Sequence, residues 1–363
     1  MPKKKEEQSF LAVEFGSSAV KLIRMQEIDG TLQLLQASSC PIPTSEDPKM
    51  QDEFLEQAAR QLLLNEKLED QKVIFSINNL HTCFSQFVIP KIPRRELKET
   101  LKWKMKDQMP FPTEEAVLDW RLFEMKSEGK SQQFSVLVSA LPQELLERFM
   151  HNLPNHVSKS VVPAYATYSI ARMSNAFSLS DHPLVVIIDI GHLITEISFY
   201  EDAKLSFLRK IAFGGHMLSQ CLMQPLTSEK GRMALSPEEA EQIKRKENLF
   251  DLANQKTVDG KIEISKLYPL IRPELEKLSG EIARSLDYYA QEHGQKPARL
   301  FITGGTSRLK GLDEFLDLLN VDATFCILNH PEAERFEILK RLGLSLGQAA
   351  LPLYLTEAVD KNA

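Results

Sequence analysis

The hydrophobic pattern opens with three short runs, at residues 10–15, 20–26 and 31–37; the first starts with the apolar run 10–13, and in the other two apolar and polar residues roughly alternate. A period of two is typical of a half-buried strand, and the polar segments between the runs predict tight turns, one of them at Asp29 and Gly30. We therefore expect a three-stranded meander. A helix and then a strand at 73–77 should follow; the apolar face of that helix consists of Phe54, Leu55, Ala58, Leu62 and Leu63.

The same plan recurs in the second half of the chain, where strands are expected at 184–190, 195–200 and 204–211. Gly214 and Gly215 then open a helical pattern of apolar residues. Such an internal repeat indicates two lobes that are diverged copies of one unit.

Between the two meanders, prolines and polar residues change the pattern. A polar helix is expected at 94–107, and Pro93 before it should end the preceding strand. Two strands at 117–123 and 134–140 follow, and then another helix. This order predicts a small helix–strand–strand–helix subdomain inserted into the first lobe.

Two helices are predicted in the second lobe. Ser236, Pro237 and Glu239 form a typical helix start, with a capping hydroxyl group, a proline at the first position and acids in the first turn. A long amphipathic helix is expected at 271–292. A strand at 298–302 then leads into a last helical pattern.

Three glycine-bearing segments carry the candidate chemistry, at residues 14–21, 189–195 and 302–307. Glycine lets backbone N–H groups approach a phosphate closely, and the neighbouring hydroxyl groups add donors. The acids Glu14 and Asp189 suit a magnesium ion with its water shell. Any one segment also fits an ordinary turn, but the three together predict a nucleotide clamp built by two lobes.

Composition narrows the class of protein. The chain has 363 residues, of which 43% are hydrophobic and 26% charged, and is long enough for two globular domains. Its net charge of −6 argues against a general nucleic-acid-binding protein. No apolar segment reaches the roughly 18 residues of a membrane span or forms a secretory signal, so a cytoplasmic location is expected. The four isolated cysteines should be reduced, buried thiols.

A longer stretch is more specific than the glycines. Residues 103–115 carry the sequence Trp-Lys-Met-Lys-Asp-Gln-Met-Pro-Phe-Pro-Thr-Glu-Glu, and Leu118, Asp119 and Trp120 follow. This stretch resembles the helix end, proline-rich turn and acidic strand start of the PilM family of type IV pilus assembly proteins. That family belongs to the actin-like ATPase superfamily and is related to the cell-division protein FtsA. The resemblance extends over residues 10–352.

The resemblance implies an α/β actin-like ATPase fold, with two lobes that each hold a mixed five-stranded sheet and helices, and a small inserted α+β subdomain of the FtsA type. It also implies a division of the chain. The parts are the first lobe at 9–91, the inserted subdomain at 92–162, a connecting helix at 163–183, the second lobe at 184–236 and 298–342, a helical subdomain at 237–297, and the C-terminal connecting helix and tail at 343–363.

The resemblance further implies ATP or ADP with Mg as the cofactor. The residues that it places at the nucleotide are Gly16, Ser17, Ser18, Lys21, Asp189, Gly191, Thr195, Gly214, Gly215, Glu241, Lys244, Gly304, Gly305 and Ser307. Glu14 and Asp189 would hold the metal through its waters. Two simpler alternatives remain, because Glu241 and Lys244 also fit a surface ion pair and Lys21 also fits an exposed strand lysine.

Three departures from the family pattern bear on hydrolysis. Glu14 stands where the family has aspartate, and its extra methylene group pushes the carboxylate into the space of the metal's waters. No acid occurs at 159–163, where relatives place one. His192 replaces a small residue beside the γ-phosphate, where it either contacts phosphate or only lines the rim. Since phosphoryl transfer depends on positioning and charge, we expect ATP to be bound but hydrolysed slowly or not at all.

The partner implied by the resemblance is the N-terminal cytoplasmic peptide of the membrane protein PilN. Through PilN the protein would lie at the inner membrane and act with PilO and, indirectly, with the pilus motor ATPases. Phe111, between two prolines, is the candidate contact for the peptide; alternatively it anchors a turn in the subdomain core. Neither nucleic-acid binding nor direct membrane insertion is expected, and a homo-oligomer stays open.

Other functions are weighed against this one. An FtsA-like cell-division scaffold would carry a C-terminal amphipathic helix, but residues 356–363 are polar. A type II secretion platform scaffold would continue into a membrane span. An actin-fold small-molecule kinase would need a catalytic aspartate in a sugar pocket, and no such residue stands out. The pilus function is therefore the favoured expectation.

Overall fold

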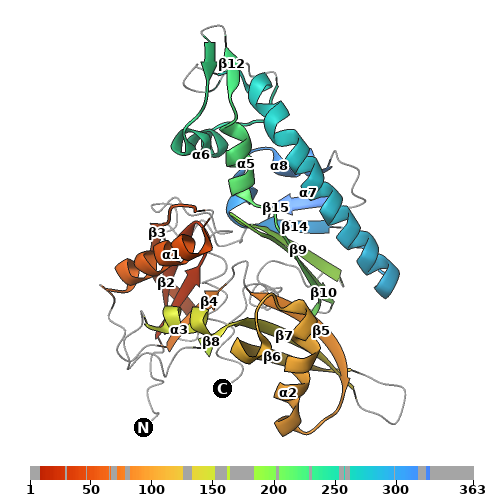
Figure 1. Cartoon of the computed structure of the whole chain (residues 1–363). Helices are drawn as coiled ribbons and strands as arrows, with labels where there is room; N and C mark the ends of the chain where they lie inside the picture. The colour runs from red at the N-terminus through yellow and green to blue at the C-terminus, as the bar shows by residue number, and fades with distance from the viewer. Residues whose placement is uncertain are drawn as a thin grey trace. The chain divides into compact units, whose positions relative to one another are not determined.

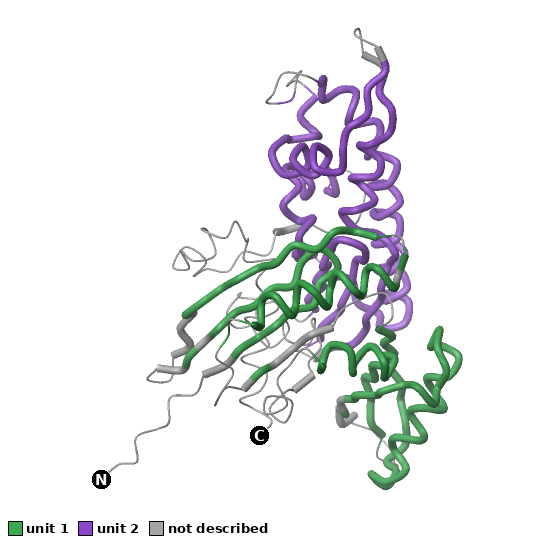
Figure 2. The backbone as a smooth tube through the Cα atoms, turned by 60° about the vertical axis from the view of Figure 1, so that its left-hand side comes forward, with its two compact units in different colours: residues 1–169, 352–363 green, residues 170–351 purple. Residues whose placement is uncertain are grey.

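The computed structural model of the chain describes residues 9–28, 31–45, 47–64, 66, 72–77, 82–125, 133–151, 162–163, 184–201, 204–228, 231–252, 257, 262–297, 299–317 and 324–327. The chain forms two compact units, residues 1–169 with 352–363 and residues 170–351, which Figure 2 distinguishes by colour. Each unit is built around its own five-stranded sheet.

The sheet of the first unit has the strand order β3–β2–β1–β4–β8. β1 (Ser9–Phe15), β2 (Ala19–Ile28) and β3 (Thr31–Pro41) form the expected antiparallel meander. β4 (Lys72–Ile77) and β8 (Val162–Pro163) extend it with parallel pairing. The sheet is therefore mixed, as expected.

Two helices, α1 (Pro48–Leu63) and α3 (Gln143–His151), complete the core of this sheet (Figure 1). α1 begins where the Asp47 side chain accepts a hydrogen bond from the backbone N–H of Lys49, a cap that satisfies one free donor of the first turn. The apolar faces of both helices pack with the buried side of the strands, and the rings of Phe15 and Phe149 lie 4.5 Å apart.

A three-stranded sheet in the order β5–β7–β6 forms the insertion. It consists of β5 (Cys83–Pro90), β6 (Ala116–Met125) and β7 (Gln133–Pro142). α2 (Arg94–Met105) packs on one face through Leu97, Leu101 and Met105. Two short 3-10 turns, η1 (Lys106–Gln108) and η2 (Thr113–Glu115), lead from α2 to β6.

β5 differs from the sequence-based division, which assigns residues up to 91 to the first lobe. Its hydrogen bonds run to β7, so it belongs to the sheet of the insertion. The apolar residues of β5 would suit either sheet, because the hydrophobic pattern of a strand does not specify its neighbour.

The second unit repeats the first, with the strand order β11–β10–β9–β14–β15. β9 (Leu184–Ile190), β10 (Thr195–Glu201) and β11 (Lys204–Ile211) form the antiparallel meander. β14 (Arg299–Thr303) and β15 (Thr324–Ile327) add the parallel strands. Since both sheets have the same order and pairing, the expected internal repeat is confirmed.

The described helices of the second unit pack against this sheet and against one another, and a short hairpin lies at the end away from the sheet (Figure 1). The Ser236 cap of α6 is confirmed as a capping box with Glu239. The elements are α5 (Gly215–Leu222), β12 (Leu226–Ser228), β13 (Gly231–Met233), α6 (Pro237–Lys246), α7 (Ile264–His293), η5 (Gly305–Arg308) and α8 (Leu312–Asp317).

α7 begins before the expected residue 271 and runs through Pro269 and Pro273. Proline inside a helix costs about 3 kcal/mol and usually ends it, which is why the sequence pattern predicts a later start. The helix continues because its apolar stripe, which includes Ile264, Leu267 and Ile271, is fully buried in the core. Burial of three such side chains outweighs the local cost.

Several expectations lie outside the described residues, namely the turn at Asp29 and Gly30, the residues at 159–161 and most of the connecting helix at 163–183, and the C-terminal segment at 343–363. Cys40, Cys83 and Cys221 are free thiols, and of these three Cys221 alone is fully buried. None of the described helices is long and apolar enough to cross a bilayer.

Candidate functional site

The same glycine turn joins the first two strands in both units. Between β1 and β2 the backbone N–H of Gly16 donates to the carbonyl of Ala19 at 3.2 Å, and between β9 and β10 that of Gly191 donates to Ile194 at 2.9 Å. A Cβ atom at either glycine would lie within 3 Å of the carbonyl oxygen that closes the turn. Glycine is therefore required at both turns for steric reasons.

The acids beside these turns have different partners. Glu14 lies directly opposite Lys21 across β1 and β2, and the Lys21 ammonium group donates to both Glu14 carboxylate oxygens at 3.0 Å. Asp189 holds the equivalent place on β9, but the residue opposite it on β10 is Glu196, which is 1% exposed. Directly opposed residues share a face of the sheet, and Lys210 on β11 lies opposite Glu196 in turn, so Asp189, Glu196 and Lys210 are neighbours across three strands of the second unit.

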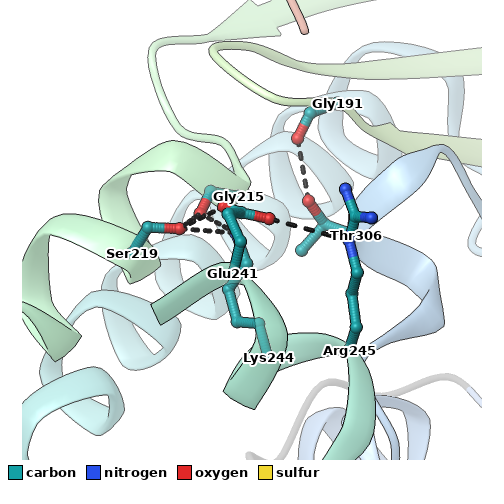
Figure 3. A network of polar contacts seen from close by, with 7 residues as sticks. All are labelled: Gly191, Gly215, Ser219, Glu241, Lys244, Arg245 and Thr306. Atoms are coloured by element: carbon teal, nitrogen blue, oxygen red, sulfur yellow. Dashed lines mark hydrogen bonds and ion pairs between the residues drawn. The ribbon is translucent and has the colours of Figure 1, made fainter. Parts of the chain in front are cut away.

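The second and third glycine segments meet in the second unit. The carbonyl oxygen of Gly191 accepts from the backbone N–H of Gly215 at 3.0 Å and from the Thr306 hydroxyl group at 2.8 Å (Figure 3). The N–H of His216 donates to the carbonyl of His192 in the same way, at 2.9 Å. Three segments far apart in the sequence thus form one backbone platform. The first segment, Gly16 to Lys21, lies in the other unit.

Gly304 shows how tightly this platform is packed. Its φ is +89°, in a region of backbone conformation that L side chains rarely adopt, and it starts the turn η5. An added Cβ atom would lie 2.3 Å from a carboxylate oxygen of Asp189 and 2.5 Å from the carbonyl oxygen of Ile190. The absence of a side chain therefore lets the third segment touch the end of β9.

A polar network from α5 and α6 borders the platform (Figure 3). The Lys244 ammonium group donates to the carbonyl of Gly215 at 2.6 Å, to the Ser219 hydroxyl group at 2.7 Å and to the Glu241 carboxylate at 2.6 Å. Its side chain is only 11% exposed. The expected pair of Glu241 and Lys244 is therefore not a solvated surface pair, because it joins α6 to the glycine start of α5.

Both members of this pair titrate abnormally. Burial lowers the pKa of Lys244, although the Glu241 carboxylate opposes this shift. Burial disfavours the charged form of Glu241, but the charge and hydrogen bond of Lys244 overcome this, and the pKa of Glu241 is lowered. Glu241 is thus held as an anion, and the pair is anchored at the edge of the platform.

Two histidines lie beside the same platform. The rings of His192 and His216 are 5.2 Å apart. Burial, followed by the positive charges of Lys244 and His216, lowers the pKa of His192 from 6.5 to about 4. His192 is therefore neutral near pH 7, and it can offer a hydrogen bond there without adding charge.

Acidification is expected to destabilise the protein through His192. Its folded pKa of about 4 is lower than the ordinary 6.5, so between these values the unfolded chain binds a proton that the folded chain does not. The free energy of unfolding should therefore fall as the pH drops from 6.5 toward 4, by about 2 to 3 kcal/mol. Urea unfolding at a series of pH values measures this loss.

The matched variants for this experiment are His192→Gln and His151→Gln. The first should remove most of the acid sensitivity, whereas the second, at an exposed histidine of α3, should leave it unchanged. An unchanged pH profile in His192→Gln would contradict the assignment.

Two arginines that the sequence analysis missed lie next to this network. Arg245 follows Lys244 on α6, and its side chain is 75% exposed. Burial and the charge of Arg245 lower the pKa of Arg308 at the end of η5, so the two cations are close enough to interact. A planar guanidinium group stacks on aromatic rings and pairs with anions. In sequence, both arginines look like ordinary surface residues, so no local signal could have found them.

The hydroxyl groups expected at the nucleotide are not equivalent. Thr195 is fully buried and donates to the carbonyl of Phe213 at 2.9 Å, and Ser307 donates to the carbonyl of Gly304 at 2.7 Å. Both therefore hold backbone segments in place. In the first unit, the hydroxyl groups of Ser17 and Ser18 make no hydrogen bond with other described residues. These two remain available as donors.

The described side chains do not form a complete set of ligands for magnesium. In the described part of the chain, no group of three or more His, Cys, Asp or Glu side chains is arranged to hold a metal ion. Asp189, with Glu196 opposite it, supplies carboxylate oxygens at the platform, whereas Glu14 is already paired with Lys21. This fits a cation held mainly by waters and ligand oxygens, as magnesium usually is with nucleotides.

Phe111 is half-buried and packs against the core between α2 and the three-stranded sheet. The neighbouring Pro110 and Pro112 are exposed. Of the two alternatives from the sequence, this packing agrees with an anchored turn, while the exposed part of the ring leaves peptide contact untested.

Comparison with known proteins places the chain in a family. The chain matches the model of the family described as type IV pilus assembly protein PilM over residues 12–332. A solved PilM–PilN type IV pilus biogenesis complex is similar, with 24% sequence identity over 95% of this chain and 98% of that chain, and a TM-score of 0.70.

Two more distant structures have related folds. MreB5 of Spiroplasma citri bound to AMPPNP has 11% identity over 98% of this chain and 96% of that chain, with a TM-score of 0.51. A non-polymerisable pCBH ParM variant has 13% identity over 97% and 98%, with a TM-score of 0.50. These likenesses confirm the expected actin-like ATPase fold. Since the family model covers most of the sequence, the chain belongs to the PilM family of type IV pilus assembly proteins.

Proposed function

We propose that this protein is a nucleotide-binding scaffold of type IV pilus assembly, which binds ATP and captures the N-terminal cytoplasmic peptide of PilN at the inner membrane. The main support for nucleotide binding is a set of hydrogen bonds: Gly215 and Thr306 both donate to the carbonyl oxygen of Gly191, and the buried Lys244 donates to Gly215 beside them. A backbone platform without side chains suits phosphate and ribose, and the neighbouring cations Arg245 and Arg308 suit an anionic ligand with an aromatic base.

Slow hydrolysis follows from the charges at the first turn. Glu14 is paired with Lys21 at 3.0 Å, so this carboxylate and this ammonium group neutralise each other. A metal ion brought with the nucleotide would supply the charge neutralisation that phosphoryl transfer requires. Asp189 is the other expected acid to orient such an ion. Binding should therefore be preserved better than turnover.

The partner part of the proposal is supported by family membership and by the likeness to a solved complex of PilM with PilN. In the described part of the insertion, β5 and β6 each pair only with β7, so both present an open edge. An extended peptide can add to such an edge through its backbone. Localisation at the inner membrane would then follow from PilN. Contacts with PilO and motor ATPases remain expectations.

One experiment tests both parts. The protein is titrated with a fluorescent PilN N-terminal peptide in the presence and absence of ATP, and phosphate release is followed in the same samples. We expect peptide binding, ATP binding and turnover well below that of ordinary ATPases. Phe111→Ala should weaken the peptide about tenfold or more if the ring is an anchor of the interface.

Phe134→Ala is the matched control, since Phe134 packs against the same cluster from β7. Both variants must melt cooperatively before affinities are compared. Unchanged affinity in folded Phe111→Ala removes this residue from the interface, and turnover at the rate of ordinary ATPases contradicts the scaffold role.

A further inference from the structure

One flank of α2 carries a row of positive charges that the proposed function does not use. Arg94, Lys98, Lys102 and Lys106 follow one another every fourth residue, so they lie along one side of the helix over roughly 18 Å. Residues 91–108 contain seven basic and three acidic residues, a net charge of +4 in a chain whose net charge is −6. Positive charge is thus concentrated on this helix.

These four cations have no partner in the described part of the chain. The ion pair that α2 forms there joins Arg95 to Glu96, at 3.5 Å, and both side chains are largely exposed. Like charges four residues apart destabilise a helix by a few tenths of a kcal/mol for each pair. The row therefore has a cost in the free protein that a negatively charged surface would remove.

Trp103, a large aromatic side chain, lies three residues before Lys106, the last cation of the row, and four residues after Glu99, so it is on the same side of the helix as both. Trp103 is 74% exposed, although α2 has a separate apolar face, Leu97, Leu101 and Met105, that is fully buried. Trp103 therefore contributes little to the core of the insertion. Tryptophan next to lysine is typical of segments that lie at the interface between a bilayer and water, where the ring enters the headgroup region.

The shape of the surface favours a bilayer over a protein as the binding partner. The exposed side of a helix is convex, whereas peptides are usually bound in a groove or at the edge of a sheet. A lipid surface requires neither, since it needs only a row of cations and an interfacial side chain. Glu99 and Asp107 lie near Trp103 and limit the strength of such binding, which should therefore be reversible and sensitive to salt.

We propose that this flank of α2, from Arg94 to Lys106, docks together with Trp103 on an anionic phospholipid surface. This contact is adsorption to the headgroups, without insertion of the helix. It uses none of the residues expected at the nucleotide, because α2 carries neither a glycine segment nor a residue of the Lys244 network. It would supply a direct contact with the membrane in addition to any contact through a protein partner.

Co-sedimentation of the full chain with vesicles tests the proposal. With about a third of the lipid as phosphatidylglycerol and about 0.1 M salt, the protein should bind, and it should be released at about 0.5 M salt and fail to bind pure phosphatidylcholine. Lys98→Gln with Lys102→Gln should weaken binding about 30-fold. Emission from Trp103 should shift to shorter wavelength on binding, a shift that Trp103→Phe removes.

The control variant is Lys49→Gln with Lys277→Gln, which changes the net charge equally at exposed lysines of α1 and α7. It should bind vesicles like the wild type. The proposal is overturned by three results: no binding to anionic vesicles, equal loss in both double variants, or capture of soluble polyglutamate without binding to vesicles. The last result would assign the row to an acidic protein partner.

Discussion

Gly304→Ala is expected to lower the free energy of unfolding by about 3 kcal/mol or more, because two costs add at this position. The backbone, at φ +89°, is strained for any residue with a Cβ atom. The new methyl group would also lie 2.3 Å from the Asp189 carboxylate and 2.5 Å from the carbonyl of Ile190. Since Ile190 is part of β9, relief of the second contact requires movement of a core strand. Urea denaturation of the wild type and the variant measures the loss.

Gly294→Ala is the matched control. Gly294 also has a positive φ, +68°, at the C-terminal end of α7, but an added Cβ atom would have no neighbour within 4 Å. Gly294→Ala should lower the free energy of unfolding only through backbone strain, by about 1 kcal/mol. The difference between the two variants therefore isolates the close approach of the third segment to β9. Equal losses would show that this approach does not constrain the platform.

The repeat and the glycine turns could be predicted from sequence because both are local. Short apolar or alternating runs mark the strands of each meander, and a glycine after an apolar strand marks a turn that needs a residue without Cβ. The structure shows the same turn at Gly16 and Gly191 and the same strand order around both. Likewise, Ser236, Pro237 and Glu239 predict the start of α6, since a helix cap depends only on neighbouring residues.

Features that depend on long-range contacts could not be predicted in this way. The pattern of β5 does not state that its neighbour is β7, and α7 begins before the expected residue 271, where Ile264 and Leu267 are buried in the core. The different roles of two neighbouring hydroxyl groups could not be predicted either. Thr306 reaches Gly191, whereas the adjacent Ser307 bonds within its own turn. Adjacent residues with the same chemistry are distinguished only by the direction of the backbone.

The two copies of the turn also show how one backbone design acquires different chemistry. At equivalent places, the first unit pairs Glu14 with Lys21 and the second sets Asp189 opposite Glu196. The hydrogen bonds of the turn are the same in both copies. Beside Glu196 the next strand of the second unit adds Lys210, whereas beside Lys21 the next strand of the first unit has Ser39. The backbone of the turn is thus kept, while the side chains on the strands that it joins change.

Lys244→Met is expected to weaken ATP binding about 100-fold, on the proposal that ATP occupies this platform. The Lys244 ammonium group holds the carbonyl of Gly215, the Ser219 hydroxyl group and the Glu241 carboxylate together. Without it, the start of α5 loses its link to α6, and Glu241 keeps a charge that is only partly solvated. The free energy of unfolding should fall by about 2 kcal/mol, less than for a fully buried pair, since Glu241 is one-third exposed.

Two further variants separate the loss of a ligand contact from the loss of stability. Lys246→Met removes an exposed lysine of the same helix and should leave both affinity and stability unchanged. Glu241→Gln combined with Lys244→Met removes the stranded charge, so stability should recover while ATP affinity stays low. Calorimetric titration with ATP and urea denaturation measure the two quantities independently. Recovery of ATP affinity in the double variant would mean that Lys244 only neutralises Glu241, and that the nucleotide does not depend on the link between α5 and α6.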